Sequence, residues 1–209
     1  MLKYFIGKFQ NVLLRISCYR NLRILKKQGA TIGTNCWFAG DIDFNIHPDA
    51  NIIIGDEVVF TSGNNINPLC SNIQGSLKVS SNGKLIIGEN SGLSSAHIWV
   101  KELVSIGKNV NIGADCIILD NDCHSLNWMI RSCNVMASNG ESVDYQSAGS
   151  SPIYIGDNVL VGTRCIILKG ATIGDRSVIG AGSIVTTSIP PDCIAAGNPC
   201  RVLKKLTHN

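Results

Sequence analysis

Aliphatic residues recur at every sixth position along much of the chain, and the residue that follows them is often glycine. The clearest run lies in the C-terminal third. Its aliphatic positions are Ile155, Val161, Ile167, Ile173, Ile179 and Val185. Earlier runs with the same spacing start at Ile32, Ile54, Ile87 and Ile106. A strand repeats its buried side chains every two residues and a helix about every 3.6. The period of six therefore predicts neither an ordinary sheet nor a helix.

A six-residue period fits short strands joined by corners, with three strands to each turn of a triangular coil. The aliphatic residue then points to the axis, and glycine relieves crowding near the bends. The fifth position of each hexad holds a compact residue, as at Cys36, Cys70, Cys116, Cys165, Ala171, Ser177 and Ser183. Stacked coils would pair their strands in parallel and bury a ladder of Ile and Val. The pattern predicts an all-β fold, a parallel β-helix.

These hexads, of the form aliphatic-Gly-x-x-small-x, resemble the left-handed parallel β-helix of the hexapeptide-repeat acyltransferases. The resemblance covers residues 30–203 and is most specific from Ile155 to Leu203, where unbroken hexads precede the segment IPPDCIAAGNP. Within that family the sequence is most similar to the galactoside, maltose and serine O-acetyltransferases and their polysaccharide-modifying relatives. The resemblance implies a triangular prism that uses acetyl-CoA.

The N-terminal segment, residues 1–28, has a different pattern. Its apolar residues follow helical spacing and its other positions are rich in Lys and Arg, which predicts one or two amphipathic helices. The apolar positions are Leu2, Phe5, Ile6, Phe9, Leu13 and Ile16. We expect the segment to cap the first coil and shield its open strand edges. A basic anchor at a membrane surface and a part in substrate binding are the alternatives.

The prism domain is predicted to span residues 29–203, followed by a C-terminal tail at 204–209. The hexads are irregular between Asn67 and Lys84, which predicts a bulged corner there. The largest break follows His124, where residues 125–152 are polar, rich in small side chains and without the hexad phase. This segment is predicted to be a loop ejected between two coils, and long loops in compact repeats are usually functional.

His124 is the candidate catalytic residue, because it ends a clean hexad run at the mouth of the predicted loop. The surrounding ILDNDCHSL resembles the catalytic histidine motif of the family, in which Asp residues precede the His. A neutral imidazole is a suitable general base near pH 7. Asp122 or Asp120 is expected to orient the ring, and strand alternation favours Asp122 because residues i and i+2 share a side. A Cys123 nucleophile is disfavoured, because adjacent strand residues face opposite ways.

The acceptor pocket is expected to be shaped by the loop. Trp128, Arg131 and Tyr145 are candidate sugar-binding residues, chosen by location alone. His97 is a further candidate for the acceptor site, although a plain surface or corner position is favoured. His47 and His208 are expected to have no catalytic role.

The C-terminal third resembles the family's coenzyme A site. The matching positions are Thr163, Ala181, Thr186, Arg201 and Lys204. Arg201 and Lys204 suit the phosphates of the cofactor, since both side chains form charge-assisted bonds to phosphate. The sequence departs from the family in two places. Thr187 replaces a frequent Lys, and Leu160 replaces a frequent Trp.

Composition and the spacing of Cys and His argue against several other classes of protein. Charged residues are 16% of the 209 residues and the net charge is +3, which does not suggest a nucleic-acid-binding protein. The nine cysteines include no C-x-x-C pair, and no His-x-x-x-x-His is present. Disulfides, a zinc cluster and a metal enzyme of the γ-carbonic anhydrase type are therefore not expected. No membrane span and no convincing secretory signal are seen, so the predicted compartment is the cytoplasm, with or without membrane association.

Together these features predict an acetyl-CoA-dependent O-acetyltransferase acting on a sugar hydroxyl of a surface glycan precursor, with no metal. The alternatives are N-acetylation of an amino sugar, a serine-type small-molecule acetyltransferase, and a scaffold without activity. The resemblance also implies a homotrimer with its sites between subunits. The acceptor, the acetylated position, the Asp that supports His124 and the oxyanion donor are left open by the sequence.

Overall fold

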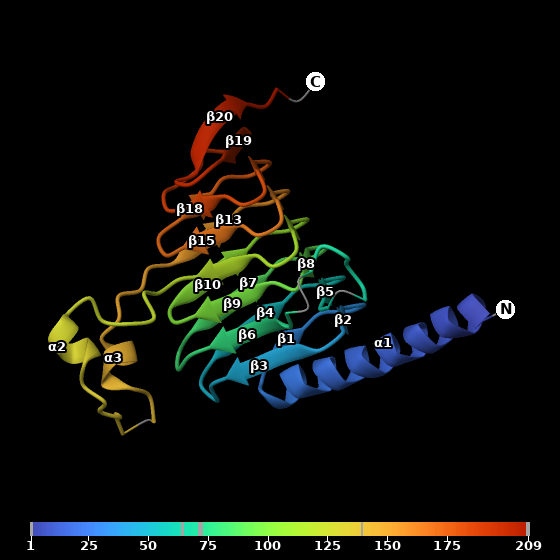
Figure 1. The fold of residues 1–209 in the computed structure, drawn as a ribbon, viewed down its shortest axis with the longest axis horizontal. Helices are drawn as coiled ribbons and strands as arrows, with labels where there is room; N and C mark the ends of the chain where they lie inside the picture. Colours follow the sequence, from blue (N-terminus) through green and yellow to red (C-terminus); the bar gives the residue numbers. More distant parts are fainter. Residues whose placement is uncertain (1, 64, 71–72, 139, 208–209) are drawn as a thin grey trace.

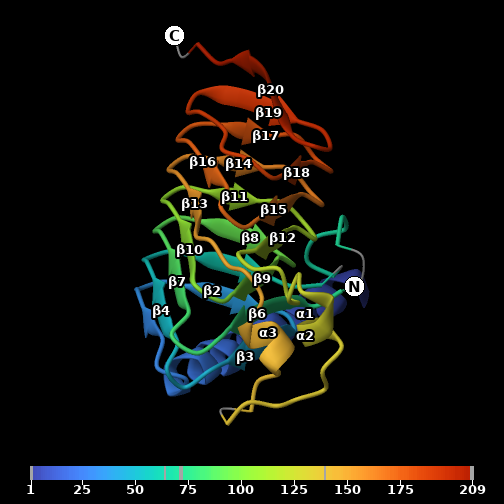
Figure 2. The same cartoon turned by 90° about the vertical axis from the view of Figure 1, so that its left-hand side faces the viewer.

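The hexads build a three-sided prism, which confirms the predicted left-handed β-helix (Figure 1). The computed structural model describes residues 2–63, 65–70, 73–138 and 140–207 and, within these ranges, the side chains from Gln10 onward. His208 and the apolar positions Leu2, Phe5, Ile6 and Phe9 lie outside the described side chains. The prism tapers toward the C-terminus, and a long helix crosses its wide end (Figures 1 and 2).

Each face of the prism is one sheet, and successive coils add one strand to each. Sheet A contains β1 (Thr31–Ile32), β4 (Asn51–Ile54), β7 (Lys84–Ile87), β10 (Leu103–Ile106), β13 (Ile153–Ile155) and β16 (Thr172–Ile173). Sheet B contains β2 (Trp37–Ala39), β5 (Val59–Thr61), β8 (Gly92–Ser94), β11 (Asn111–Ile112), β14 (Leu160–Val161), β17 (Val178–Ile179), β19 (Cys193–Ala196) and β20 (Arg201–Lys205). Sheet C contains β3 (Ile42–Ile46), β6 (Gly75–Val79), β9 (His97–Val100), β12 (Ile117–Leu119), β15 (Ile166–Leu168) and β18 (Ile184–Val185).

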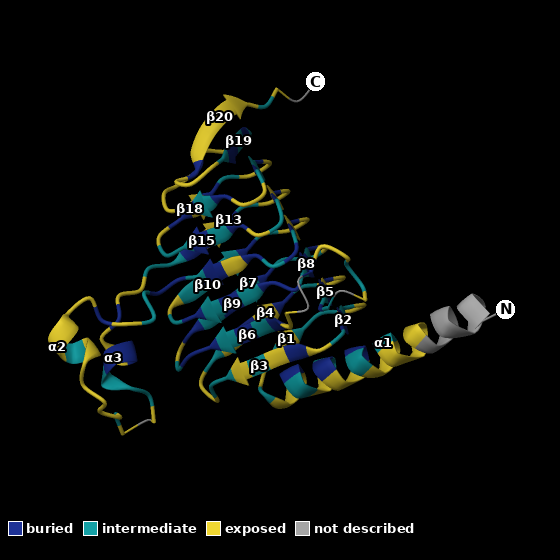
Figure 3. Ribbon diagram, viewed as in Figure 1, coloured by how far each residue is buried: buried dark blue, intermediate teal, exposed yellow. Residues whose placement is uncertain are grey.

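The aliphatic hexad positions stack in columns along the axis. Ile87, Ile106, Ile155 and Ile173 are paired in parallel register across four coils of sheet A. All four are almost completely buried, and Figure 3 shows the same pattern of buried residues along the interior. Burying one such side chain stabilises a fold by about 1.5–3 kcal/mol. The repeated column therefore accounts for the core without large aromatic residues.

Glycine and asparagine have separate roles at the corners. A Cβ added to Gly162 would lie 2.5 Å from the backbone nitrogen of Ala181, so this glycine permits close stacking of adjacent coils. The left-handed residue of the bend is a different one, three positions after the aliphatic residue. Asn109 has φ 54° and Asn158 has φ 58°. Asparagine tolerates this conformation better than most residues. Glycine thus relieves crowding near the bends, as expected, while asparagine supplies the left-handed residue.

The compact fifth position of the hexad explains several cysteines. Cys116 and Cys165 are fully buried, and their thiols donate to the carbonyl oxygens of Gly162 and Gly180 at 3.1 and 3.2 Å. Each thiol thus joins one coil to the next. All nine cysteines lie in the described part of the chain and carry free thiols. Six of them are buried, in agreement with their interpretation as small buried residues, whereas Cys36 and Cys123 are half-buried and Cys133 is exposed.

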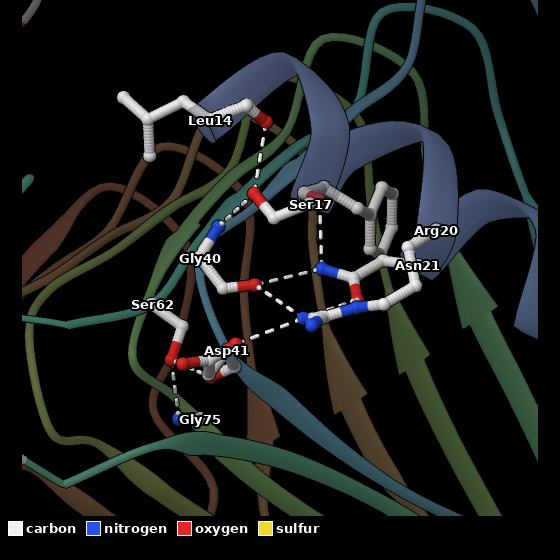
Figure 4. A network of polar contacts seen from close by, with 9 residues as sticks. Leu14, Ser17, Arg20, Asn21, Gly40, Asp41, Ser62 and Gly75 are labelled. Atoms are coloured by element: carbon white, nitrogen blue, oxygen red, sulfur yellow. Dashed lines mark hydrogen bonds and ion pairs between the residues drawn. The ribbon is translucent and has the colours of Figure 1, made fainter. Parts of the chain in front are cut away.

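A single helix, α1 (Leu2–Lys27), closes the wide end of the prism. Leu25 at its C-terminal end is fully buried in the core. Asn21 is also buried, and its side-chain amide donates to the carbonyl oxygens of Phe38 and Gly40, both at 2.9 Å (Figure 4). Arg20 pairs with Asp41 at 2.9 Å in the same network. The buried amide satisfies two carbonyl groups that would otherwise be unpaired, and so docks the helix on the first coil.

Two loops interrupt the coils. The first leaves between β5 and β6, at residues 62–74, while β6 itself is regular. The predicted bulge therefore lies earlier than residues 67–84. The second, at residues 120–152, leaves between β12 and β13 and carries α2 (Trp128–Arg131) and α3 (Val143–Gln146), which project from the prism (Figures 1 and 2). At the narrow end β20 pairs antiparallel with β19, so the predicted tail at 204–209 begins inside a strand.

Candidate active site

His124 lies where the second loop leaves the edge between sheets C and A. An antiparallel bridge between Asn121 and Ser150 closes the neck of this loop. The side chains of Asn127 and Ser142 cap the first turns of α2 and α3. These caps fix the path of the chain, so that α3 returns toward His124 although it lies about twenty residues further along the sequence.

The carboxylate of Asp144, on α3, holds the imidazole ring of His124. The Nδ1 of His124 and the Oδ2 of Asp144 are 2.5 Å apart, and the other carboxylate oxygen accepts the backbone N–H of Ser125 at 2.7 Å. The hydrogen bond to His124, and then that from Ser125, lower the pKa of Asp144. An ionised carboxylate can only accept, so Nδ1 is the donor and carries the proton. The lone pair of a neutral ring is then on Nε2.

The prediction that Asp122 supports His124 is wrong. The carboxylate of Asp122 pairs instead with the ammonium group of Lys169 at 2.8 Å. Strand alternation does not apply here, because Cys123 adopts the left-handed conformation with φ 60° and the backbone bends between the two residues. For the same reason Cys123 and His124 line one cavity rather than facing opposite ways.

Asp120 does not contact His124 either. It is fully buried, and its two carboxylate oxygens accept the backbone N–H groups of Lys101, Glu102 and Leu103 at 2.7–2.8 Å. These groups form the bend between β9 and β10. Asp120 therefore stabilises the neighbouring corner of the prism rather than the imidazole ring.

Cys123 is poorly suited to act as a nucleophile. Burial raises the pKa of its thiol, and the charge of Lys78 opposes that effect only in part. A reactive cysteine needs its thiolate form near neutral pH. The structure thus supports the sequence-based preference for His124, although for a different reason from strand alternation.

A cavity of about 490 Å³ opens beside His124. One wall is the outer face of sheet C and the other is the returning loop. Its polar and aromatic lining includes Asn45, His47, Lys78, Ser80, Trp99, Glu141, Ser142 and Tyr145. His124 also lines a second cavity of about 380 Å³, together with Arg131 and Asp144. His124 is thus common to both cavities.

The candidate acceptor residues fall in different places. Tyr145 lines the cavity of about 490 Å³, where its ring stacks on Trp99 with centroids 5.5 Å apart. Arg131 lines the second cavity and donates to the carbonyl oxygen of Ser125 at 2.6 Å. Trp128 lies 68% exposed on α2 and lines neither cavity. His97 is bonded to Ser76 at 3.1 Å on the outer face of sheet C, where burial lowers its pKa.

Sequence reasoning missed Asp144, Lys78 and Trp99. One signal was available for Asp144, because it and Glu141 are the only acidic residues in the predicted loop. Lys78 and Trp99 occupy outward-facing positions of sheet C, which the hexad leaves unspecified. Their proximity depends on the stacking of two coils.

The residues matched to a coenzyme A site lie on different parts of the prism. Thr163 and Ala181 follow β14 and β17, at the edge between sheets B and C. Thr186 follows β18 at the edge between sheets C and A, the same edge as His124. Arg201 and Lys204 are exposed on β20. One chain therefore does not bring all five residues together beside the imidazole ring.

The described residues contain no group of three or more His, Cys, Asp or Glu side chains that could hold a metal ion. They also contain no helix with the length and apolar character needed to cross a membrane.

Comparison with known protein families gives a match to part of the chain. A family model described as "Hexapeptide repeat of succinyl-transferase" matches residues 103–118 and 152–187. The matched segments are coils on either side of the loop that carries His124. The resemblance predicted from the hexads is confirmed in these coils.

The curated relatives that the chain matches are named as acetyltransferases. Galactoside O-acetyltransferase of Escherichia coli K12 is 44% identical over 103 residues, which is 49% of this chain and 44% of that protein. A putative acetyltransferase of Staphylococcus aureus strain Mu50 is 42% identical over 125 residues, 51% of this chain and 57% of the relative. The chain thus spans about half the length of these relatives.

Solved structures agree on the fold. A hexapeptide-repeat acetyltransferase of Vibrio cholerae in complex with acetyl-CoA has a TM-score of 0.60 at 19% identity, covering 97% of this chain and 85% of that one. A maltose O-acetyltransferase of Clostridium difficile has a TM-score of 0.54 at 26% identity, covering 96% and 86%.

Proposed function

We propose that this protein is an acetyl-CoA-dependent O-acetyltransferase that acts on a sugar hydroxyl. The observation that carries the proposal is the His124–Asp144 pair, which stands at a cavity large enough for a sugar. The galactoside and maltose O-acetyltransferases among its relatives support the reaction class and the type of acceptor. A glycan precursor for the cell surface, acetylated in the cytoplasm, is the acceptor that we infer.

In this mechanism His124 is the general base. Its Nε2 takes the proton from the acceptor hydroxyl while the hydroxyl oxygen attacks the thioester carbonyl of acetyl-CoA. The tetrahedral intermediate then expels the thiolate of coenzyme A, which receives the proton from the imidazolium ring. Asp144 holds the ring in one orientation and stabilises its protonated form through the pair at 2.5 Å. Both substrates are bound together, so no acyl-enzyme is needed.

We propose that five residues contact coenzyme A, namely Thr163, Ala181, Thr186, Arg201 and Lys204. Arg201 and Lys204 are exposed on β20, where their charges are accessible to phosphate groups. Thr163 and Ala181 lie on a different edge of the prism from His124. A neighbouring subunit that brings its own edge beside His124 would complete the site, which supports a trimer with sites between subunits.

Acetyl transfer is tested directly by measuring the free thiol released from acetyl-CoA. The acceptor panel should include nucleotide sugars, lipid-linked oligosaccharides, amino sugars and serine. We expect thiol release to depend on acceptors that offer a sugar hydroxyl. Release with amino sugars or serine alone would support the N-acetyl or serine-type alternative, and no release with any acceptor would favour a scaffold.

The proposed trimer predicts the molecular mass of the protein in solution. Light scattering of the purified protein should give three times the mass of the 209-residue chain. The expectation follows from the division of the proposed site between two edges of the prism. A monomer that transfers acetyl groups at full rate would contradict the shared-site proposal.

We also propose that α1 contacts an anionic membrane surface. The face of α1 turned away from the prism exposes Val12, Leu13, Ile16 and Tyr19. Residues 2–27 contain no acidic side chain, and exposed basic residues continue the same face at Arg23, Lys26 and Lys27. Apolar side chains beside basic ones suit the interface of a bilayer that contains acidic lipids.

Vesicle binding tests this surface. Wild-type protein should sediment with vesicles of phosphatidylglycerol and phosphatidylcholine, but not with phosphatidylcholine alone. The double variant Arg23→Glu/Lys27→Glu should bind at least about 10-fold more weakly, because each basic residue near the surface contributes about 1 kcal/mol. The matched control is Leu203→Ser/Lys205→Glu on the exposed strand β20, at the far end of the prism. Equal binding by both variants would contradict the proposal.

A further inference from the structure

The ammonium group of Lys78 stands in the cavity beside His124 without a carboxylate partner. Strand β6 places Lys78 on the outer face of sheet C, in register with Asn45 of β3 and Trp99 of β9. Its Nζ lies 3.7 Å from the centre of the Trp99 ring and 5.5 Å from that of Tyr145. No ion pair formed by the described residues includes Lys78.

The other cations near this site have partners within the protein. Lys101 donates to the carbonyl oxygens of residues 145, 146 and 148 at the end of α3, at 2.6–2.9 Å. Lys169 pairs with Asp122, and Arg131 donates to the carbonyl oxygen of Ser125. Lys101 and Lys169 hold the loop against the prism, and Arg131 joins two parts of the loop. Lys78 differs, because its contacts are to the faces of aromatic rings that already have their own support.

The two rings keep Lys78 in a fixed position. The indole N–H of Trp99 donates to the hydroxyl oxygen of Tyr145 at 2.9 Å, and that hydroxyl shares a further hydrogen bond with Ser80 at 2.6 Å. The rings stack with an interplanar angle of 26°. A cation above an aromatic face is stabilised without being neutralised, so it can still accept an anion from solution.

The charge of Lys78 also acts at the catalytic end of the cavity. It lowers the pKa of the Cys123 thiol, against the larger effect of burial. Cys123 directly precedes His124 in the sequence. Glu141 also lines this cavity, where its charge acts to raise the pKa of Lys101 and of Tyr145. An anion bound by Lys78 would therefore lie in the same cavity as the imidazole ring.

We infer that Lys78 binds an anionic group of the acceptor, so the preferred acceptor is a sugar that carries a carboxylate or a phosphate in addition to the hydroxyl that is acetylated. The inference rests on the proposed function and adds the substrate class. A neutral sugar can be held by hydrogen bonds and by aromatic contacts alone. A cation that forms no ion pair with the described residues is explained when the ligand supplies the opposite charge.

The experiment compares three acceptors that share one sugar. Methyl galactopyranosiduronate carries a carboxylate, galactose 1-phosphate carries a phosphate, and methyl galactopyranoside is neutral. In the wild-type protein, kcat/KM for at least one acidic acceptor should exceed that for the neutral one by roughly 10- to 100-fold, the range expected for a charged hydrogen bond. The comparison of the carboxylate acceptor with the phosphate acceptor identifies which anion is recognised.

Lys78→Met should remove this preference mainly through KM, since it keeps the apolar stem of the side chain and loses the charge. Lys78→Arg should retain much of it. Lys84→Met, on sheet A, is the matched control and should leave kcat/KM unchanged for acidic and neutral acceptors. Equal rates for acidic and neutral acceptors in the wild type, or an equal loss for both in Lys78→Met, would overturn the inference.

Binding measured without acetyl-CoA separates this inference from the proposed function. The quenching of tryptophan fluorescence by each acceptor reports occupancy of the cavity, because Trp99 forms part of its wall. Binding of the acidic sugars that depends on Lys78, without acetyl transfer, would leave the anion site standing and refute the transferase. Transfer to neutral sugars that is unchanged in Lys78→Met would support the transferase and refute the anion site.

Discussion

Replacing His124 with alanine should lower acetyl transfer by about 10²- to 10⁴-fold, the usual contribution of a positioned general base. An alcohol is a poor nucleophile until its proton is removed, and His124 is the imidazole common to both cavities. The loss should appear in kcat more than in KM. Thiol release from acetyl-CoA in the presence of the best acceptor is the measurement.

The matched control is His97→Gln. His97 lies on β9 of sheet C and is bonded to Ser76, and glutamine can keep that hydrogen bond. We expect this variant to transfer acetyl groups at a rate close to that of the wild type. Thermal unfolding of both variants should show that they remain folded. Turnover that is unchanged in His124→Ala would refute the proposed mechanism.

The fold was predictable because the hexad is a local rule that repeats. Each coil uses the same spacing of Ile or Val, glycine and a compact residue. One hexad alone would be weak evidence for a coil, but many hexads with the same spacing together predict the fold. The structure confirms this in the column that includes Ile106 and Ile155. The thiols of Cys116 and Cys165 follow the same rule.

The candidate site was only partly predictable. His124 was found because it ends a hexad run. Asp144 was missed because a loop without any repeat brings it back, guided by caps such as that of Ser142 on α3. The choice of Asp122 failed because it assumed an extended strand where the backbone adopts a positive φ at Cys123.

The pairing of Lys78 with Trp99 illustrates a second limit. These residues are twenty-one positions apart and meet only because β6 and β9 stack in register. The hexad constrains side chains that point to the axis, where packing selects their size. Outward positions have no such constraint, so their chemistry becomes visible only when the coils are placed in space.

Replacing Asp144 with asparagine should reduce kcat by about 10²-fold or more, because the amide neither fixes the tautomer nor stabilises the imidazolium ring. The lowered pKa of Asp144 keeps it ionised at neutral pH. Its contribution to stability should therefore be complete above the ordinary pKa of an aspartate, about 3.9, and should be lost as the pH falls toward the lowered value.

Kinetics and folding measured together separate a positioning role for Asp144 from a structural one. We expect Asp144→Asn to remain folded, as judged by circular dichroism, while kcat falls and KM changes little. A loss caused only by misfolding would appear in the circular dichroism spectrum as well as in kcat. Asp122→Asn is the decisive comparison, since Asp122 precedes His124 in the sequence but pairs with Lys169 in the structure. If Asp122→Asn lowered kcat and Asp144→Asn did not, the assignment of Asp144 would be wrong.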